Sequence, residues 1–540
     1  MSQSAQQHIE PSAKEMRLVI GASSVGTVFE WYDFFIYGTL GAILSKTFFP
    51  TGNATLEMLL FWLVFAVGFG FRPLGAVLFG YLGDKLGRKY TFLVTVTLMG
   101  VATAGVGLIP SAASIGYWAP AIVILLRILQ GLALGGEYGG AAIYVAEHSA
   151  FAKRGYHTSY IQASVVGGFV LSLAVVLGCK AVMSTETWND WGWRVPFLLS
   201  ILLLAISLWM RFKLSESPVF QAMKEEGELA GNPFVESFTY PGNKRRIFIA
   251  LFGIAAGLTV IWYTAMFSGL SFLKSAMHIE DTAAELIVGL AALLGMGFFI
   301  YFGSLSDRIG RKKPIVIGYA LTLLLLFPTY WFIGAVAKDP AQQTAIEWTL
   351  RGPDCTYQPF AAKQESRCGK LMADFAGAGV PYTLETSDRL ELVAAGKGVI
   401  ALDDLALDDA KARKAEIEKR AGQTVFNFAK HTPSLGQAAL ILAGLLLLMA
   451  LSGATYGPVA ALLAEMFPPK VRYSSMSIPY HIGTGYFGGF LPFIASYIVA
   501  RSGDPYSGLW YTWVVVLIAF LVSWWGLPDG KPRDFADDAT

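Results

Sequence analysis

Charged side chains are scarce in this chain. Aspartate, glutamate, lysine and arginine make up 15% of its 540 residues, whereas hydrophobic residues make up 54%. This composition, with a mean hydropathy of +0.51, excludes an ordinary soluble protein. The net charge of +2 and the short, scattered basic clusters also exclude a nucleic-acid partner. We therefore expect most of the chain to lie in a lipid bilayer.

Catalytic and metal-binding motifs are absent from the sequence. It contains no Walker loop, no HExxH motif and no nucleophile elbow, and Cys355 and Cys368 have no further ligands for zinc. We therefore expect no enzyme activity, no metal and no cofactor. No small-residue cleavage site follows the first apolar run, so we expect a retained first span rather than a removed signal peptide.

Long apolar runs are abundant. A bilayer core about 30 Å thick needs about 20 mainly apolar residues per helix, because lipid offers no partner for backbone N–H and C=O groups. Such runs occur at 18–43, 56–82, 91–110, 118–145, 157–183, 193–213, 246–274, 283–304, 314–337, 434–457, 475–500 and 508–527. The sequence therefore predicts an all-α membrane protein with twelve transmembrane helices in two six-helix bundles, at 18–213 and 246–527.

Loop charges predict the orientation of these bundles. Lysine and arginine are concentrated in the short loops on one side, which the positive-inside rule assigns to the cytoplasm. The tails at 1–17 and 528–540 and the central loop at 214–245 are then cytoplasmic. The long segment at 338–433 becomes a periplasmic insertion between helices 9 and 10.

The insertion is rich in charge and is expected to form a small exposed subdomain. Its segment Asp403–Arg420 (DDLALDDAKARKAEIEKR) has the pattern of a solvated helix. Cys355 and Cys368 also lie in the insertion. In one interpretation they form a disulfide, and in the other they are two free surface thiols. Cys179 lies in a span and is expected to be a packing residue.

Two short patterns occur once in each half. The basic turn Gly80–Lys89 (GYLGDKLGRK) is repeated as Gly303–Lys312 (GSLSDRIGRK), and a Glu-to-Arg spacing of seven positions occurs twice. The cations alone could be topology anchors, but the repeated Asp and Gly favour a charged latch that closes the inner face. The latch residues are Gly80, Asp84, Gly87, Arg88, Glu147, Arg154, Gly303, Asp307, Gly310, Arg311, Glu465 and Arg472.

Ionisable residues inside the spans are costly in lipid and are therefore candidates for function. The first half places Glu30, Asp33, Arg72, Arg127 and Glu137 within its spans. At about 1.5 Å per residue, helix position sorts them into two layers: Glu30, Arg72 and Glu137 near the midplane, and Asp33 facing Arg127 nearer the outside. In the functional interpretation Arg72 or Arg127 binds an anionic substrate while one of the carboxyls takes a proton. In the structural one these groups are fixed ion pairs.

The second half contributes few such charges, and its candidates are polar aromatic residues. Tyr263, Tyr480 and His481 are suited to substrate contact, with Tyr37 from the first helix. His481 could equally be a packing residue. In the fourth span, glycines at every fourth position from Gly131 allow two helix backbones to approach closely.

The basic turns and the sequence Arg127-Ile128-Leu129-Gln130-Gly131 resemble the signature loop and fourth-helix motif of the major facilitator superfamily. Four more segments are similar to its metabolite:proton symporter branch, which includes carriers of shikimate, 2-oxoglutarate, citrate and other dicarboxylates, and proline or betaine. They are FEWYDF at 29–34, FRPLG at 71–75, GGEYGG at 135–140 and WRVPF at 193–197. The insertion departs from the short outer loop of this branch.

The resemblance implies two bundles that rock about a central site, with the basic loops holding the inner gate in the outward-facing state. It also implies that Arg127 lies near the proton or substrate path and Arg72 near an anionic substrate. We therefore expect a monomeric inner-membrane proton symporter of a small organic acid or zwitterion. The alternatives are a proton-driven exporter or exchanger, and a receptor-like protein that senses a solute through the insertion.

Overall fold

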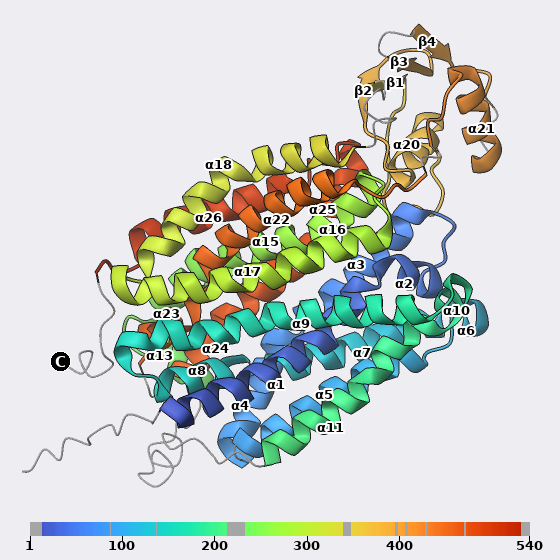
Figure 1. The fold of residues 1–540 in the computed structure, drawn as a ribbon. Helices are drawn as coiled ribbons and strands as arrows, with labels where there is room; N and C mark the ends of the chain where they lie inside the picture. The colour runs from blue at the N-terminus through green and yellow to red at the C-terminus, as the bar shows by residue number, and fades with distance from the viewer. Residues whose placement is uncertain are drawn as a thin grey trace, which may run out of the picture.

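The computed structural model describes residues 13–86, 88–136, 138–212, 233–338, 347–394, 398–405, 409–426, 429–468 and 471–530. It consists of long helices side by side, with a small subdomain at one end (Figure 1). Among the described residues, ten helices are long and apolar enough to cross a membrane. The paths of α1 (Ala13–Thr39) and α5 (Arg88–Leu108) complete the twelve that the sequence predicts.

The first bundle follows the six predicted runs, with ends that differ by a few residues. Short breaks divide some paths, because Phe71 and Gly136 interrupt the second and fourth. Besides α1 and α5, its elements are α2 (Gly41–Phe48), α3 (Ala54–Gly70), α4 (Arg72–Leu86), α7 (Trp118–Gly135), α8 (Tyr138–His148), α9 (Arg154–Val182) and α11 (Val195–Phe212). The short helices α6 (Ala112–Ile115) and α10 (Thr185–Asp190) lie in its connections.

The second bundle follows the other six runs. Its first path is irregular: π-helical segments η3 (Ile249–Ala255), η4 (Thr264–Ser268) and η5 (Phe272–Ala276) alternate with α14 (Asn243–Phe248), α15 (Ala256–Tyr263) and α16 (Gly269–Ser271). The other paths are α17 (Asp281–Ile309), α18 (Lys312–Ala337), α22 (Leu435–Tyr456) with α23 (Val459–Met466), α24 (Arg472–Ile482) with η7 (Gly483–Gly489) and α25 (Leu491–Ser502), and α26 (Leu509–Gly526). The predicted central loop also holds a helix, α13 (Pro233–Thr239).

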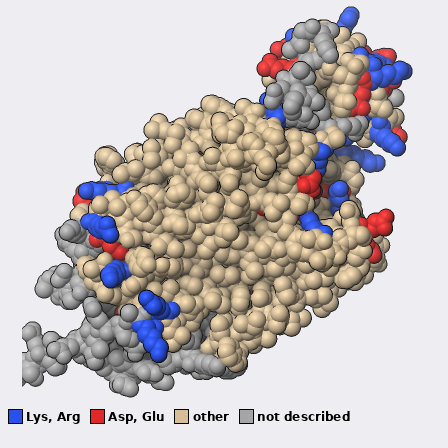
Figure 2. Space-filling view, viewed as in Figure 1, with Lys and Arg blue, Asp and Glu red and all other residues tan. Residues whose placement is uncertain are grey.

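Charge separates the two ends of the molecule from its middle. Figure 2 shows lysine, arginine, aspartate and glutamate gathered at the ends and on the subdomain, with an uncharged band between them. We call the end that carries the subdomain the insertion end, and the opposite end, which holds the turn at Gly310–Arg311, the loop end. The start of α1 and the end of α26 both lie at the loop end (Figure 1). This distribution is the one a bilayer imposes on a helix bundle.

Glycine determines how closely α7 packs against α3 and α4, as the sequence predicts. A Cβ atom at Gly131 would overlap the carbonyl oxygen of Gly68, and one at Gly135 would overlap that of Arg72. In the second bundle, Gly453 and Gly457 pack in the same way against the backbone of α17. The glycine pattern of the fourth span is therefore a packing device.

We expect Gly131→Ala to lower the stability of the bundle by roughly 1–3 kcal/mol, because the added methyl group must displace backbone rather than a flexible side chain. The thermal midpoint of the purified protein in detergent measures this effect. Gly178→Ala in α9 is the matched control, since no atom lies within 4 Å of its added Cβ. Equal midpoints for the two variants would contradict the close approach.

The insertion adds a four-stranded sheet to the all-α bundles. Its strand order is β2-β1-β3-β4, with β1 (Trp348–Gly352) parallel to β2 (Tyr382–Thr386) and antiparallel to β3 (Glu391–Ala394), which pairs with β4 (Gly398–Ala401). The helices α20 (Arg367–Gly377) and α21 (Ala410–Ala421) complete it. Leu350, Leu371, Phe375 and Ile417 form a core of its own that also reaches Ala500 of α25.

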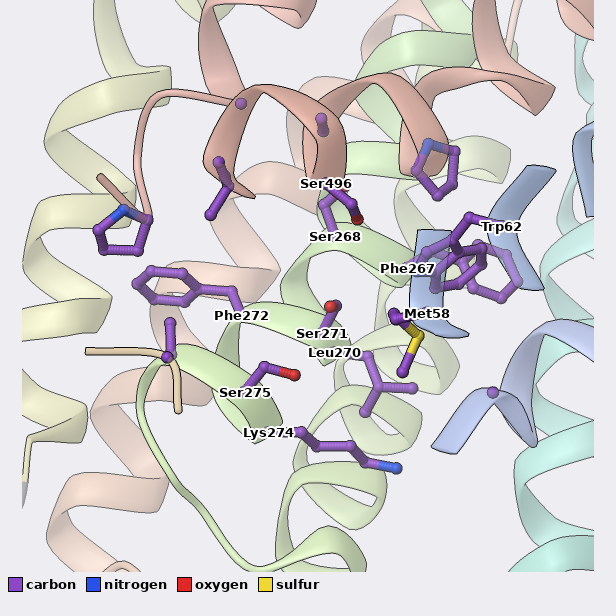
Figure 3. A pocket seen from close by; sticks show the side chains of 18 of the residues that line it. Met58, Trp62, Phe267, Ser268, Leu270, Ser271, Phe272, Lys274, Ser275 and Ser496 are labelled. Atoms are coloured by element: carbon purple, nitrogen blue, oxygen red, sulfur yellow. The ribbon is translucent and has the colours of Figure 1, made fainter. Parts of the chain in front are cut away.

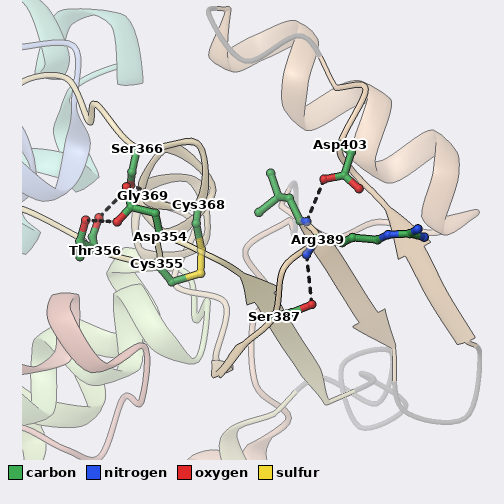
Figure 4. Close-up of a disulfide and its surroundings, with 10 residues drawn as sticks. Asp354, Cys355, Thr356, Ser366, Cys368, Gly369, Ser387, Arg389 and Asp403 are labelled. Atoms are coloured by element: carbon green, nitrogen blue, oxygen red, sulfur yellow. Dashed lines mark hydrogen bonds between the residues drawn. A yellow bond between two sulfur atoms is a disulfide. The ribbon is translucent and has the colours of Figure 1, made fainter.

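The structure joins Cys355 and Cys368 by a disulfide, with Cα atoms 4.7 Å apart, which decides between the two interpretations of this pair (Figure 4). The solvated helix predicted at Asp403–Arg420 is wrong at its start: α21 begins at Ala410. The Asp409 side chain accepts hydrogen bonds from the N–H groups of Lys411 and Ala412 and thereby caps this helix. Arg413 and Ile417 are buried on its inner face, so the helix is only partly solvated.

Candidate functional site

At the loop end, Asp307 joins the two bundles. It lies near the end of α17, and its carboxylate accepts hydrogen bonds from the N–H groups of Gly155 (2.8 Å) and Tyr156 (2.9 Å), in the first turn of α9. A carboxylate is stabilised at a helix N-terminus by the free N–H groups and the helix dipole. Arg311 donates to the same carboxylate at 2.6 Å and to Glu465 at 2.9 Å. All these side chains are buried or nearly so.

The repeated Glu-to-Arg spacings pair across the bundles rather than within them. Arg154 of the first bundle contacts Glu465 of the second at 3.5 Å, and Arg472 of the second contacts Glu147 of the first at 3.1 Å. Arg154 and Glu465 connect with Arg311 and Asp307. We call this connected group, together with the separate pair of Arg472 and Glu147, the loop-end network. It fits the predicted latch, because it ties the two bundles together at this end.

The glycines of the second basic turn also have structural roles. Gly303 lies against Ser159 and the backbone of Gly155, and Gly310 has φ +92° at the end of α17. In the first turn, the side chains of Asp84 and Arg88 and the residue Gly87 lie outside the described part of the chain, and Gly80 is described only as part of α4. Glu137 also lies outside the described residues.

Midway along the bundles, an aromatic cluster fills the interface. Its members come from α1, α3, α15 and η4, and their ring centroids lie 4.4–6.5 Å from one another in successive contacts. They are Phe34, Phe35, Phe65, Phe69, Trp262, Tyr263 and Phe267, all at most 3% exposed. At this level, rings of the first bundle therefore contact rings of the second directly.

Arg127 lies against this cluster and is completely buried. Its guanidinium carbon is 4.2 Å from the ring centroid of Phe34 and 4.7 Å from that of Tyr37. The guanidinium also donates to the side chain of Gln130 at 2.8 Å. Among the described residues no carboxylate forms an ion pair with Arg127, so the fixed ion pair of the structural interpretation is not formed between Arg127 and Asp33.

Asp33 and Arg127 are connected through Gln130 instead. The Gln130 amide donates to the Thr103 hydroxyl at 2.7 Å and to the backbone carbonyl of Asp33 at 3.5 Å. The Asp33 side chain is buried, and one of its oxygens has no hydrogen-bond partner in the described part of the protein. A buried carboxyl without an ion-pair partner can gain or lose a proton without breaking a salt bridge.

Arg72 is the first residue of α4. It is completely buried, 5.2 Å from the ring centroid of Trp31 and 5.3 Å from that of Phe69. Trp31 directly follows Glu30, which is also buried, so Arg72 and Glu30 share the level that helix position predicts. The helix α24, with Tyr480 and His481, packs against α4. Tyr480 shares a hydrogen bond of 2.7 Å with Tyr456.

A cavity of about 470 Å³ lies between the bundles at the insertion end (Figure 3). Trp62 and Phe267 line it from opposite bundles, 6.1 Å apart between ring centroids. Hydroxyl groups from the first path of the second bundle and lysines from both bundles complete the polar lining. Ala376–Gly379 of the insertion lines one side. Phe65 packs 5.5 Å from Trp62 on one side and 5.2 Å from the Arg127 guanidinium on the other. One aromatic layer therefore separates the cavity from Arg127.

Among the predicted site residues that the structure describes, several lie at the aromatic cluster and none lines the cavity. Tyr263 belongs to the cluster, and Arg72, Arg127 and Tyr37 contact it directly. The cavity wall holds residues that the sequence interpretation did not select. These are Trp62, Phe267, Ser268, Ser271 and Lys274.

Sequence reasoning also missed Glu285, a buried carboxylate in the predicted span 283–304. It is one of the few ionisable groups that the second half places within its predicted spans. Its position inside a predicted apolar run was the signal that could have found it.

Two helical bundles joined at one end by ion pairs, with a cavity between them at the other end, define a membrane carrier rather than an enzyme. The family described as "Sugar (and other) transporter" matches residues 18–247 and 421–537, which is more than half of the chain. The chain belongs to this family of the major facilitator superfamily. Much of the insertion lies outside the matched residues.

Several known bacterial transporters are similar in sequence to this chain, two of them over about 60% of its length and one over 94%. It is 35% identical to the proline/betaine transporter of Salmonella typhimurium over 59% of the chain, which spans 65% of that protein. It is 35% identical to the shikimate transporter of E. coli over 60% of the chain and 74% of that protein. The E. coli inner membrane metabolite transport protein YhjE is 28% identical over 94% of the chain and 93% of its own length.

Among solved structures, the partially occluded inward-open xylose transporter XylE of E. coli superimposes with a TM-score of 0.60. The alignment covers 97% of this chain and all of that one at 15% identity, so the shared feature is the fold.

Proposed function

We propose that the protein is a secondary active transporter that moves a small organic anion or zwitterion with protons by alternating access. The observation that carries the proposal is the asymmetry of the bundle interface. The loop-end network closes one end, while the cavity lies at the other end above the buried Arg127, Arg72 and Asp33. Relatives named for proline, betaine and shikimate support a small charged or zwitterionic substrate.

In this proposal the insertion end faces the periplasm and the loop end, with both termini, faces the cytoplasm of a bacterial inner membrane. The lysine and arginine bias of the short loops supports this orientation. A substrate then enters the cavity, passes the aromatic layer and meets the two arginines. Asp33 carries the coupled proton, and no cofactor takes part. The protein acts as a monomer surrounded by lipid.

Uptake by proteoliposomes that hold the purified full-length protein tests the proposal. Labelled 2-oxoglutarate, shikimate, proline and glycine betaine are offered with and without an imposed inward proton gradient. We expect at least one of them to accumulate only with the gradient and to be released when a protonophore is added. Uptake at the same rate with and without the proton gradient would favour an exchanger. Movement of substrate only out of the vesicles would favour an exporter.

We expect Asp33→Asn to abolish accumulation while substrate exchange across the membrane continues. Asparagine has nearly the same shape as aspartate but cannot bind and release the coupled proton. Counterflow and gradient-driven uptake, measured on the same vesicles, separate the two activities. Asp190→Asn removes a carboxylate from the exposed helix α10 and serves as the control. Unchanged accumulation by Asp33→Asn would exclude Asp33 as the proton carrier.

A further inference from the structure

One helical stretch places an ammonium group and several hydroxyls along the cavity wall. Ser268, Ser271, Lys274 and Ser275 all line the cavity. Ser268, Ser271 and Lys274 follow one another at intervals of three residues, and Ser275 lies four residues after Ser271. Figure 3 shows these four side chains on the same stretch of chain at the cavity. Hydroxyl and ammonium groups arranged in this way are hydrogen-bond donors for a carboxylate.

The charge of the cavity is positive. Among the described residues that line it, the charged ones are Lys46, Lys274, Lys430 and Asp281. Lys430 and Asp281 pair with each other at 2.7 Å. Lys46 comes from the first bundle and is exposed, and no described carboxylate forms an ion pair with it. The excess of lysine attracts an anionic group into the cavity.

Lys274 shares its partner, Glu285, with a second lysine. The Glu285 side chain is 2% exposed, and one of its oxygens accepts from Lys274 at 2.7 Å. Lys180, from α9 of the other bundle, donates to both Glu285 oxygens at 2.9 and 2.8 Å. Two cations therefore surround one buried carboxylate, and one of the two faces the cavity.

This sharing makes the contact between Lys274 and Glu285 replaceable. Breaking a buried ion pair is costly when it leaves a charge without a partner. Here Glu285 would keep both hydrogen bonds from Lys180 if Lys274 turned away. An incoming carboxylate would then accept hydrogen bonds from Lys274. Lys180, Lys274, Glu285 and the added carboxylate would together have no net charge.

We propose that Lys274, with Ser271 and Ser275, forms a carboxylate-binding site in the cavity wall, and that the substrate carboxylate replaces Glu285 as the partner of Lys274 before the substrate reaches Arg127. The proposal rests on the proposed transport function and adds a first binding site for the carboxylate. The substrate class is a small mono- or dicarboxylate or a zwitterion that carries a carboxylate.

Calorimetric titration of the purified full-length protein, without any proton gradient, tests the site. The probes are 2-oxoglutarate, shikimate and glycine betaine, with choline as the counterpart of glycine betaine that lacks a carboxylate. We expect Lys274→Gln to raise the Kd for the carboxylates that bind by about tenfold, the effect of losing one partly buried charge contact. We expect Glu285→Gln to lower the Kd, because it removes the competing carboxylate. Choline should show neither effect.

The opposite signs distinguish ligand binding from a structural role. If the lysine and the glutamate only held the bundles together, both substitutions would weaken binding and lower the thermal midpoint, which would overturn the proposal. Lys363→Gln is the control, since Lys363 is an exposed lysine of the insertion that does not line the cavity. An unchanged Kd in Lys274→Gln, or a wild-type protein that binds none of the three carboxylates, would also overturn it.

The titration tests the carboxylate-binding site independently of the proposed proton-coupled transport. A tenfold difference between wild type and Lys274→Gln supports the site even if uptake in vesicles does not depend on a proton gradient. Proton-driven uptake with equal Kd values for both proteins supports the mechanism and excludes the site.

Discussion

Replacing Arg127 by alanine is expected to abolish gradient-driven uptake while the protein still reaches the membrane. The guanidinium is completely buried, and its contacts are aromatic rings, backbone carbonyls and Gln130 rather than a carboxylate. Its charge is therefore available to an anionic group that passes the aromatic layer. A buried charge contact with a ligand is worth about 2–5 kcal/mol, so we expect a loss of about 100-fold or more.

Replacing Arg127 by lysine tests whether transport depends on the positive charge alone or also on the shape of the guanidinium group. Arg127→Lys keeps the charge but loses the planar group that lies over Phe34 and Tyr37, so we expect it to restore only part of the activity. Arg501→Ala, which removes an exposed arginine at the insertion end, is the control and should transport normally. Thermal midpoints in detergent establish that each variant is folded. Near-normal uptake by Arg127→Ala would show that Arg127 is not needed to bind the anionic group of the substrate.

Asp307→Asn is expected to open the loop end and to reduce transport by about tenfold or more. The substitution preserves the size of the side chain but removes the charge that the N-terminus of α9 and Arg311 both contact. Hydrogen bonds to a charged group contribute about 1.5–3 kcal/mol each, so losing this charge should shift the balance of states by about 10-fold to 100-fold. The state closed at the loop end would then be depleted.

The reactivity of a cysteine placed at Ser159 measures this opening. Ser159 is completely buried where α9 meets Gly303 of α17. In a protein that also carries Cys179→Ala, we expect Ser159→Cys to react slowly with a membrane-permeant thiol reagent, and much faster when Asp307→Asn is added. Asp529→Asn is the control, because Asp529 is 87% exposed and pairs with Lys312 at the same end. Equal rates for the two aspartate variants would contradict a latch at this end.

The sequence predicted the helical framework well because lipid constrains it strongly. Every spanning segment must satisfy its own backbone hydrogen bonds, so each of the twelve apolar runs became a helical path. The same constraint did not apply to the insertion, where the four-stranded sheet went unpredicted and the helix at Asp403–Arg420 was placed too early. There, Asp409 as the capping residue decided the start of α21.

The site was predicted in part, and the failures have a common cause. Helix position put Arg72 and Glu30 at one level, since rise per residue is fixed within a helix, and the structure places the Arg72 guanidinium 5.2 Å from the ring of Trp31, the residue after Glu30. It could not give the rotation of one helix against another, and so it left open whether Asp33 and Arg127 form an ion pair. In the structure Arg127 contacts Gln130 instead. In the sequence Lys274 was counted as a charge of a short outer loop, whereas the structure places it in the cavity wall and pairs it with Glu285.

The amino-acid sequence by itself determined the number of spans and the buried charges of the first half, because these depend on the cost of placing each residue in lipid. The repeated basic turns showed that the two halves are related. Only the tertiary structure decided that Arg154 pairs with Glu465 and Arg472 with Glu147, across the halves. It also decided that the aromatic cluster separates the cavity from Arg127. Such contacts depend on how the bundles pack against each other, and a pattern along one chain does not contain that geometry.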